Sequence, residues 1–255
     1  MSPTESALVY DFSALTDRGR VRQQNEDSIT ALPEYGIWAV ADGMGGHEAG
    51  DVASRIIVEE LGSLGVPISA QDQRARVLER LDRAHQRILS HAGERGLRGA
   101  GSTVAALLLH GSELACIWAG DSRIYLMREG RLTPLTRDHS EVAMMVAAGT
   151  MTADQARNAP RRNVITRAIG IGDDPRPEVA SGVIKPGDRF LLCSDGLTEH
   201  LKDHEIAGFV ARSPSVQDTA SALINETLVR GARDNVSVIV IDCVAVPPSG
   251  DEDVE

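Results

Sequence analysis

The stretch "WAVADGMGGHEAG" (38–50) joins an apolar run to a glycine-rich turn. The run stops on the carboxylate of Asp42, and four glycines follow within eight residues. Three interpretations are open: glycines that cradle a phosphate, a metal held by Asp42, or a tight turn into a helix. A GxGxxG phosphate loop that begins at Gly43 fails, because Glu48 stands where the last glycine should be and no Gly-Lys-Ser/Thr follows.

The composition indicates one sizeable domain with its own core, since 42% of the 255 residues are hydrophobic. A net charge of −11 argues against binding to nucleic acids or membrane surfaces. An anionic substrate would then need bound divalent cations to reverse the local field. The chain has three widely spaced cysteines, no CxxC pair, no signal peptide and no apolar run of transmembrane length. These features predict a cytoplasmic protein.

Strand-like and helix-like segments alternate along the chain in blocks. The strand-like runs are short, rich in β-branched residues and bounded by Gly or Asp: 7–15, 36–42, 101–109, 113–120, 123–127, 188–194 and 235–244. Helix-like runs cover 48–61, 71–92, 203–211 and 215–231, with Asp203 and Ser215 as expected N-caps. Short links between several strands require antiparallel neighbours. We therefore predict an α+β fold in which two antiparallel sheets pack together, with helices outside.

The predicted fold forms one domain over residues 1–246. Within it, residues 138–170 hold short helical pieces and few strand signals, so we interpret them as an inserted surface flap. The Pro, Gly and acidic residues of 247–255 predict a disordered tail.

Five aspartates begin or end apolar strands: Asp27, Asp42, Asp121, Asp195 and Asp234. A single Asp at such a place is usually a turn residue or a cap. Five at equivalent places predict that the strand ends converge at one rim. Converging carboxylates repel one another unless a cation neutralises them. Oxygen ligands without a Cys or His cluster favour Mg²⁺ or Mn²⁺ over Zn²⁺, and Gly43 would let the backbone carbonyl beside Asp42 turn inward.

Eight motifs, in order, resemble the PP2C-type metal-dependent Ser/Thr protein phosphatases, and the bacterial branch most of all. The motifs are "TDRGRVRQQNEDS" (16–28), "VADGMGGHEAG" (40–50), "GSTVAALLL" (101–109), "AGDSRIYL" (119–126), "LTRDHS" (135–140), "ITRAIG" (165–170), "LLCSDGL" (191–197) and "RDNVSVIVI" (233–241). The resemblance covers nearly the whole chain and implies an αββα sandwich with a metal cluster between the sheets.

The resemblance also implies roles for individual residues. Asp42 would bridge two metals, with the Gly43 carbonyl on one of them. Asp195 and Asp234 would complete the other site. Asp27, with Glu26 behind it, would act through or beside a metal-bound water. Asp121 would join Asp195 at a weaker third metal, and Arg22 would hold the substrate phosphate through its planar fork.

Some residues depart from the family pattern or stand outside it. Eukaryotic members of the family commonly carry a His general acid directly after the Asp-Gly pair, but here, as in many bacterial members, that position is Met44. His47 lies three residues on and is not equivalent, so we expect it to serve the entry of a helix. His200 and His204 have the i, i+4 spacing of a zinc pair, but no further ligand pattern accompanies them and we expect a surface pair. Arg161, in the flap, is a candidate contact for a phosphoprotein.

The sequence thus predicts a monomeric, cytoplasmic phosphatase that depends on Mn²⁺ or Mg²⁺ and acts on phosphoserine and phosphothreonine in proteins. It would oppose a Hanks-type Ser/Thr kinase. Two rivals remain at this point. One is a non-catalytic signalling domain on the same fold, and the other is a metal-dependent hydrolase of small phosphoesters.

Overall fold

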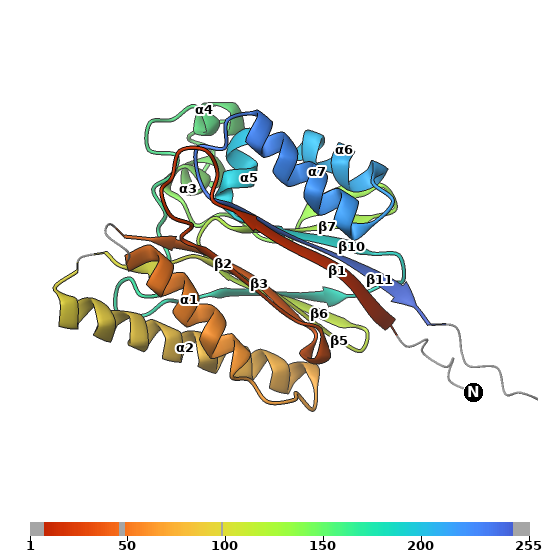
Figure 1. Cartoon of the computed structure of the whole chain (residues 1–255), viewed down its shortest axis with the longest axis horizontal. Helices are drawn as coiled ribbons and strands as arrows, with labels where there is room; N and C mark the ends of the chain where they lie inside the picture. Colours follow the sequence, from red (N-terminus) through yellow and green to blue (C-terminus); the bar gives the residue numbers. More distant parts are fainter. Residues whose placement is uncertain (1–7, 46–48, 98, 247–255) are drawn as a thin grey trace, which may run out of the picture.

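The chain folds into two antiparallel β-sheets that pack face to face, with helices on both outer surfaces (Figure 1). The computed structural model describes residues 8–45, 49–97 and 99–246. The layers therefore run helix, sheet, sheet, helix, which confirms the predicted fold class.

Sheet I has five strands and sheet II has six. In spatial order, sheet I contains β1 (Leu8–Asp17), β11 (Val236–Ala245), β10 (Arg189–Cys193), β7 (Arg123–Arg128) and β8 (Arg131–Pro134). Sheet II contains β2 (Asp27–Leu32), β3 (Ile37–Met44), β5 (Val104–His110), β6 (Glu113–Ala119) and β9 (Glu178–Val183), and the short β4 (Gly101–Ser102) also pairs with β3. A 3₁₀ turn, Pro33–Tyr35, links β2 to β3.

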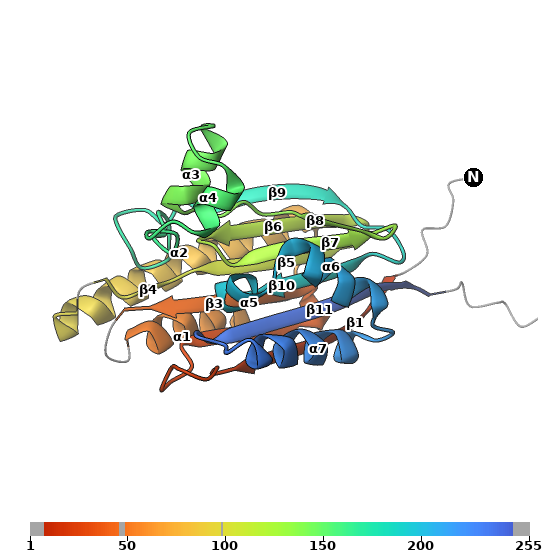
Figure 2. The ribbon, with the colours of Figure 1, turned by 90° about the horizontal axis from the view of Figure 1, so that it is seen from above.

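Helices from the two halves of the chain cover different sheets (Figures 1 and 2). Sheet II carries α1 (Ala49–Gly62) and α2 (Ala70–Arg95), whereas sheet I carries α5 (Asp195–His200), α6 (Asp203–Arg212) and α7 (Val216–Val229). The ends of α2 follow ordinary capping chemistry. The Ser69 side chain accepts a hydrogen bond from the N–H of Asp72, and Gly96 closes the helix in the left-handed conformation.

The central strands are apolar on both faces because each sheet is covered on both sides. In β3, Ile37 and Ala39 pack toward the helices, while Trp38 and Val40 point between the sheets. The Trp38 ring meets those of Tyr10 and Phe12 from sheet I edge to face, at centroid distances of 5.3 and 6.1 Å. These contacts join the two sheets at their centre.

Two strands missed in the sequence, β8 and β9, lie at sheet edges, and so does β2, the strand that Asp27 begins. An edge strand has one neighbour and stays partly exposed, so its apolar pattern is weak; β9 buries none of its six residues fully. The short helix α5 was also missed. The expected N-cap of α6 at Asp203 was wrong, because the cap is Lys202 and Asp203 is the first helical residue. Ser215 does cap α7.

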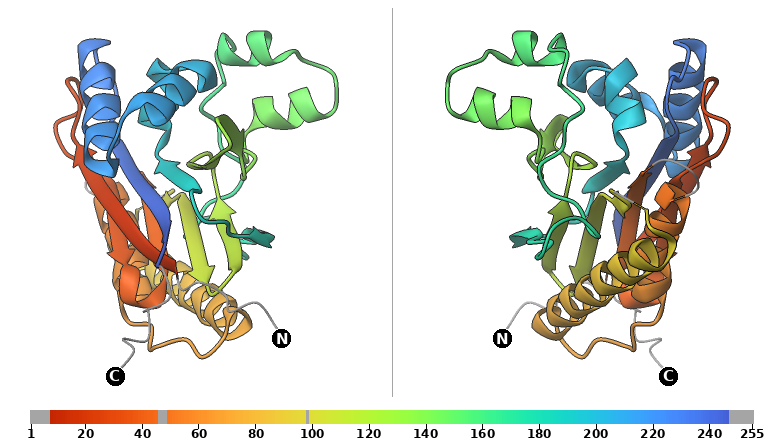
Figure 3. Two further views of the ribbon diagram at one scale, coloured as in Figure 1. Left: turned by 90° about the vertical axis from the view of Figure 1, so that its right-hand side faces the viewer. Right: turned by 90° about the vertical axis from the view of Figure 1, so that its left-hand side faces the viewer.

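The flap segment, residues 138–170, holds two short helices, α3 (Glu141–Ala147) and α4 (Ala153–Arg157). They stand to one side of the sandwich, in green in Figure 3. Within the described ranges, no helix has the length and apolar composition needed to cross a membrane. The assignment of one domain to residues 1–246 stays a prediction, and the tail, 247–255, lies outside the described residues.

Candidate metal centre

Two of the predicted carboxylates sit opposite each other on neighbouring strands. Asp27 begins β2 and pairs in register with Asp42 of β3. Residues paired in this way have Cβ atoms about 5 Å apart on the same face of the sheet. The register between β2 and β3 therefore brings two acidic side chains together, which is costly without a compensating group.

Asp27 also connects the two sheets. One of its carboxylate oxygens, Oδ2, accepts hydrogen bonds from the hydroxyls of Ser194 at 2.8 Å and Ser237 at 2.7 Å, both on the sheet I side. Asp27 is buried, and its other oxygen, Oδ1, has no hydrogen-bond partner among the described residues. The two serines thus hold the carboxylate still while one oxygen remains available.

Asp195 enters the same region from sheet I. It is the first residue of α5, directly after β10, and its buried Oδ1 also has no partner in the described part of the chain. The turn packs tightly against the segment that carries Asp234, because a Cβ on Gly196 would lie 1.9 Å from the carbonyl oxygen of Asn235. Glycine at this position lets the two acidic segments approach each other.

Asp121 lies in the turn between β6 and β7, and Thr103 ties this turn to Asp42. The Thr103 hydroxyl accepts from the N–H of Asp42 at 3.2 Å and shares a 2.8 Å hydrogen bond with the hydroxyl of Ser122. The N–H of Thr103 donates to the carbonyl of Asp42 at 2.8 Å. Gly120, at φ 112°, leaves room for the Thr103 side chain, which a Cβ there would meet at 2.5 Å.

The charges of the other four aspartates all act on Asp42, so the five lie near one another. Burial raises the pKa of Asp42, and the negative charges of the other four raise it further. Burial raises the pKa of Asp27 to about 6, although hydrogen bonds from Ser237 and Ser194 act in the opposite direction. Burial also raises the pKa of Asp121 to about 7. Neighbouring carboxylates with raised pKa values are candidates for a cation-binding site.

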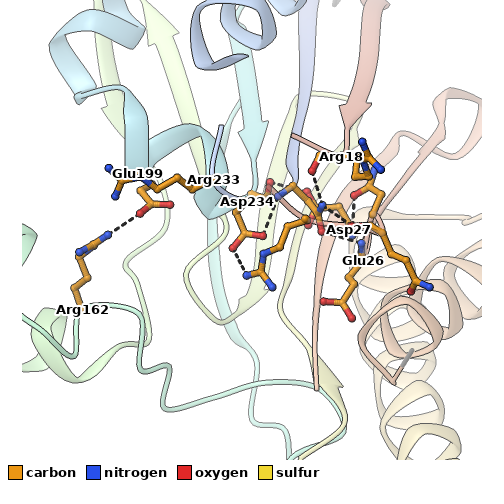
Figure 4. A network of polar contacts seen from close by, with 12 residues as sticks. Arg18, Glu26, Asp27, Arg162, Glu199, Arg233 and Asp234 are labelled. Atoms are coloured by element: carbon orange, nitrogen blue, oxygen red, sulfur yellow. Dashed lines mark hydrogen bonds and ion pairs between the residues drawn. The ribbon is translucent and has the colours of Figure 1, made fainter. Parts of the chain in front are cut away.

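Arg22 lies beside this cluster. Its guanidinium donates to Oδ2 of Asp234 at 2.6 Å, and this hydrogen bond is the main cause of its raised pKa. About half of the Arg22 side chain, 49%, is exposed. The loop that carries it is held by the buried Asn235, whose amide donates to the carbonyls of Arg18 and Gln24 at 2.9 Å each (Figure 4).

Glu26 lies behind the cluster. Asn235 Oδ1 accepts from the N–H of Glu26 at 2.8 Å, and the Glu26 carbonyl accepts from the N–H of Gly43 at 3.1 Å. Burial raises the pKa of the Glu26 carboxyl. Its side chain packs against Gly50, where a Cβ would lie 2.8 Å from Oε1. Glu26 thus connects Asn235, Gly43 and Gly50, and its supporting role at the centre stays a prediction.

The donor set fits a hard divalent cation. Two carboxylate oxygens, one on Asp27 and one on Asp195, are buried without a partner. Gly43 has no room for a side chain, since a Cβ would meet the Gly50 carbonyl at 2.1 Å. Carboxylate and carbonyl oxygens are the ligands that Mg²⁺ and Mn²⁺ prefer. No three His, Cys, Asp or Glu side chains within the described ranges already surround one point, and Asp234 is engaged by Arg22.

The other predicted residues fall outside this cluster. Arg161 is 70% exposed and forms a two-pronged ion pair with Glu141 inside the flap, with both distances 2.8 Å. His200 accepts a hydrogen bond from the N–H of Arg233 and belongs to no group of metal ligands among the described residues. His47 lies outside the described residues.

Comparison with known proteins agrees with this arrangement. Residues 17–232 match the model of the family described as protein phosphatase 2C. The chain belongs to the protein phosphatase 2C family. This result confirms the resemblance found in the motifs.

Relatives similar to this chain include bacterial phosphatases. The chain is 38% identical over 238 residues to the serine/threonine protein phosphatase PstP of Mycobacterium tuberculosis, which covers 93% of this chain and 46% of PstP. It is 35% identical to a putative protein phosphatase 2C-type of Streptococcus pyogenes, which covers 90% of this chain and 96% of that protein. The chain thus spans about half the length of the first of these curated relatives.

Solved structures of family members superpose closely. PppA, described as a key regulatory component of the T6SS in Pseudomonas aeruginosa, gives a TM-score of 0.86 at 36% identity, over 92% of this chain and 98% of PppA. The catalytic domain of PstP in complex with two manganese ions gives a TM-score of 0.82 at 35% identity, over 93% of this chain and 100% of the PstP domain.

Sequence reasoning missed the polar residues that position the acidic side chains of this family member: Ser194, Ser237, Thr103 and Asn235. Each is buried and hydrogen-bonded at or beside the cluster. A signal was present, because "LLCSD" and "DNVSV" each place a polar residue inside an apolar run. A buried hydroxyl needs a partner, and a neighbouring carboxylate is a good one.

Proposed function

We propose that this chain is a metal-dependent protein phosphatase that removes phosphate from phosphoserine and phosphothreonine in other proteins. The observation that carries the proposal is the gathering of five aspartates, with Arg22 beside them, at one end of the sandwich. Manganese in a PstP structure supports the choice of Mn²⁺ or Mg²⁺ as cofactor. The retention of all five aspartates argues against a non-catalytic domain on the same fold.

Two tight metal sites and a weaker third are proposed at the cluster. Asp42 and the Gly43 carbonyl, with Asp195 and Asp234, would hold the first two, and Asp121 would contribute to the third with Asp195. When bound, the cations would supply a water nucleophile at neutral pH and neutralise the phosphate oxygens.

The chain's own residues would bind the phosphate and handle protons. Arg22 is exposed enough to reach a substrate and presents a planar fork that matches phosphate oxygens. To do so it must exchange Asp234 for the substrate. The Oδ1 of Asp27, which has no partner among the described residues, would accept a proton from the attacking water, while Ser194 and Ser237 keep the carboxylate oriented.

Protonation of the leaving serine oxygen needs a source other than residue 44. Met44 ends β3, and its thioether cannot donate a proton. We propose that water held near Asp121 supplies this proton. The wider setting is part of the same proposal: a cytoplasmic monomer that acts on phosphoproteins and opposes a Hanks-type kinase.

The test is phosphate release from a phosphoserine peptide by protein stripped with EDTA. Mn²⁺ should restore activity and Zn²⁺ should not, because the donors are hard oxygens. Full activity in EDTA would exclude the metal mechanism. A higher kcat/KM for small phosphate monoesters than for every phosphopeptide would instead favour a hydrolase of small phosphoesters.

A further inference from the structure

A cavity of about 710 Å³ opens between the flap and the helices on sheet I. At one end it reaches Asp121 and Asp195 of the carboxylate centre. From there it extends beneath the flap, so a ligand whose reacting group lies at the centre would continue into it. A cavity of this size is typical of ligand sites.

One wall of the cavity is apolar and comes from the flap. Helix α3 contributes Val142, Ala143, Val146 and Ala147, and α4 contributes Ala153 and Ala156. Val142 and Val146 are four residues apart and therefore lie on one face of α3. No residue of α3 is fully buried. The apolar face of this helix thus looks into the cavity rather than into a protein core.

Polar contacts at its ends hold α3 in place. The Ser140 side chain caps the helix by accepting from the N–H of Ala143, and the N–H of Glu141 donates to the carbonyl of Val164 at 3.0 Å. The ion pair between Arg161 and Glu141 adds a further link across the flap. These contacts fix the wall without using the aliphatic side chains that face the cavity.

Most charges around the cavity are already paired. Arg162 bridges the flap to α5 through a 2.6 Å contact with Glu199, visible in Figure 4. Arg123 binds both oxygens of Asp138 at 2.7 Å. Paired charges of this kind do not select a further anion, so the aliphatic wall dominates the recognition chemistry.

We propose that this cavity is a specificity pocket for an aliphatic side chain of the phosphorylated peptide, a few residues from the phosphoserine or phosphothreonine. The proposal rests on the proposed protein phosphatase activity. The occupant must carry a phosphate ester at the end near Asp121 and Asp195, and an aliphatic group against Val142 and Val146. An extended peptide meets both demands, because it advances about 3.3 Å per residue and alternates its side chains.

Two arginines at the cavity fit the same occupant. Arg137 and Arg233 are exposed and line the cavity. Within the described residues, neither guanidinium makes an ion pair or a hydrogen bond. Guanidinium groups at such positions can donate to the carbonyl oxygens of a peptide backbone. A small phosphoester would leave both the aliphatic wall and these donors without contacts.

The experiment uses the full chain with Mn²⁺ and a set of phosphoserine peptides on an alanine background. A leucine is moved from four positions before the phosphoserine to four positions after it. At one or two positions leucine should raise kcat/KM about tenfold over alanine, which is the effect of burying a medium-sized aliphatic side chain. Equal rates for leucine at every position would overturn the pocket.

Two variants of α3 distinguish the loss of an aliphatic contact in the cavity from a general disturbance of the helix. Val146→Asn should reduce the leucine-to-alanine ratio at the preferred position from about tenfold to below about twofold. Met145→Asn is the matched control, because Met145 is 44% exposed and does not line the cavity, and it should keep the full ratio. A full ratio in Val146→Asn, or an equal loss in both variants, would contradict the assignment.

The outcomes also distinguish this proposal from the one on which it rests. If no phosphopeptide is hydrolysed while an aryl phosphate is, the protein phosphatase function itself fails, and the pocket with it. If phosphopeptides are hydrolysed without a preference for leucine, only the pocket fails.

Discussion

The carboxylate centre and the flap form two walls of one cavity, but different forces hold them. At the centre, Asp27 is buried and fixed by two hydroxyls from the opposite sheet. In the flap, α3 buries no residue fully and is held by a cap and by the exposed ion pair between Arg161 and Glu141, which solvent screens. The difference indicates that the two sheets fix the positions of the acidic side chains, whereas residues of the flap can be substituted with little loss of stability. Substitutions should therefore have large effects at the centre and small ones in the flap.

The largest effect is expected from Asp42→Asn. Asp42 is the acidic side chain whose pKa the other four aspartates all raise, so it stands at the middle of the cluster. Removing its charge should lower kcat at least about a thousandfold, the scale of metal-assisted charge stabilisation. Phosphopeptide turnover measures this, with Asp11→Asn on the exposed side of β1 as the control. If Asp42→Asn retained a tenth of the activity, the carboxylate centre would not be more sensitive to substitution than the flap.

The next effect concerns pH and stability in EDTA. Burial raises the folded-state pKa of Asp27 to about 6 and that of Asp121 to about 7, whereas an unfolded Asp titrates near about 3.9. The folded state therefore binds these protons more tightly, and its stability rises as the pH falls from above 7 toward 4.

Urea unfolding in EDTA should show this rise. The free energy of unfolding should increase by about 4 kcal/mol between pH 8 and pH 5. Asp121→Asn should flatten the slope, since Asn does not titrate. A stability that instead increases toward pH 8 would show that folding does not raise the pKa values of these carboxylates.

Arg22→Ala should raise KM for a phosphopeptide about tenfold, because it removes a charged hydrogen-bonding fork from the phosphate. The KM of Arg22→Lys should lie between that of the unaltered protein and that of Arg22→Ala, since lysine keeps the positive charge but lacks the planar guanidinium. Arg20→Ala is the control, because Arg20 is exposed and, among the described residues, only its backbone is anchored, by a 2.8 Å hydrogen bond to Ala232. An unchanged KM in Arg22→Ala would make Arg22 a surface residue.

Asp121→Ala should affect substrates unequally. A serine alkoxide is a poor leaving group and needs a proton, whereas a phenolate leaves readily by itself. Phosphoserine peptide hydrolysis should therefore fall about tenfold, and hydrolysis of an aryl phosphate less than about threefold. Steady-state kinetics on both substrates decide this. Equal losses would exclude a leaving-group role for the region around Asp121.

The smallest effect is expected from Arg161→Ala in the flap. Its ion pair with Glu141 is exposed, and Arg161 does not line the cavity. Turnover of a phosphopeptide should stay within about twofold of the unaltered protein, as for most exposed pairs. A loss as large as that of Arg22→Ala would indicate that Arg161 contacts the substrate, and that the flap is as sensitive to substitution as the carboxylate centre.

The sequence revealed the parts of the fold that are buried on both faces. Central strands such as β3 and β11 appear as apolar runs, whereas the edge strands β8 and β9 do not, because solvent covers part of each. The five aspartates were visible for the same reason, since each begins or ends an apolar run. Their roles as metal ligands stay predictions.

The partners of the aspartates were harder to see. A lone serine in a strand, such as Ser237, is common, and only the packing of two sheets shows that it meets Asp27. The direction of adjacent residues was also hidden. Arg161 turns toward Glu141 within the flap, while its neighbour Arg162 lines the cavity. The backbone of an irregular segment decides this, and no periodic pattern reports it.

The pairing of β1 with β11 also suggests where the protein can be attached to something else. Leu8 lies opposite Ala245, and Asp17 lies opposite Val236, so both strands run the full length of sheet I side by side (Figure 1). Val236 follows directly on Asp234 and Asn235, which places Leu8 and Ala245 at the far end, roughly 30 Å from the carboxylates. A short linker between these two residues, with new ends opened elsewhere in the chain, would give a circular permutant, and a surface tether there would hold the molecule with its carboxylate end facing the solution.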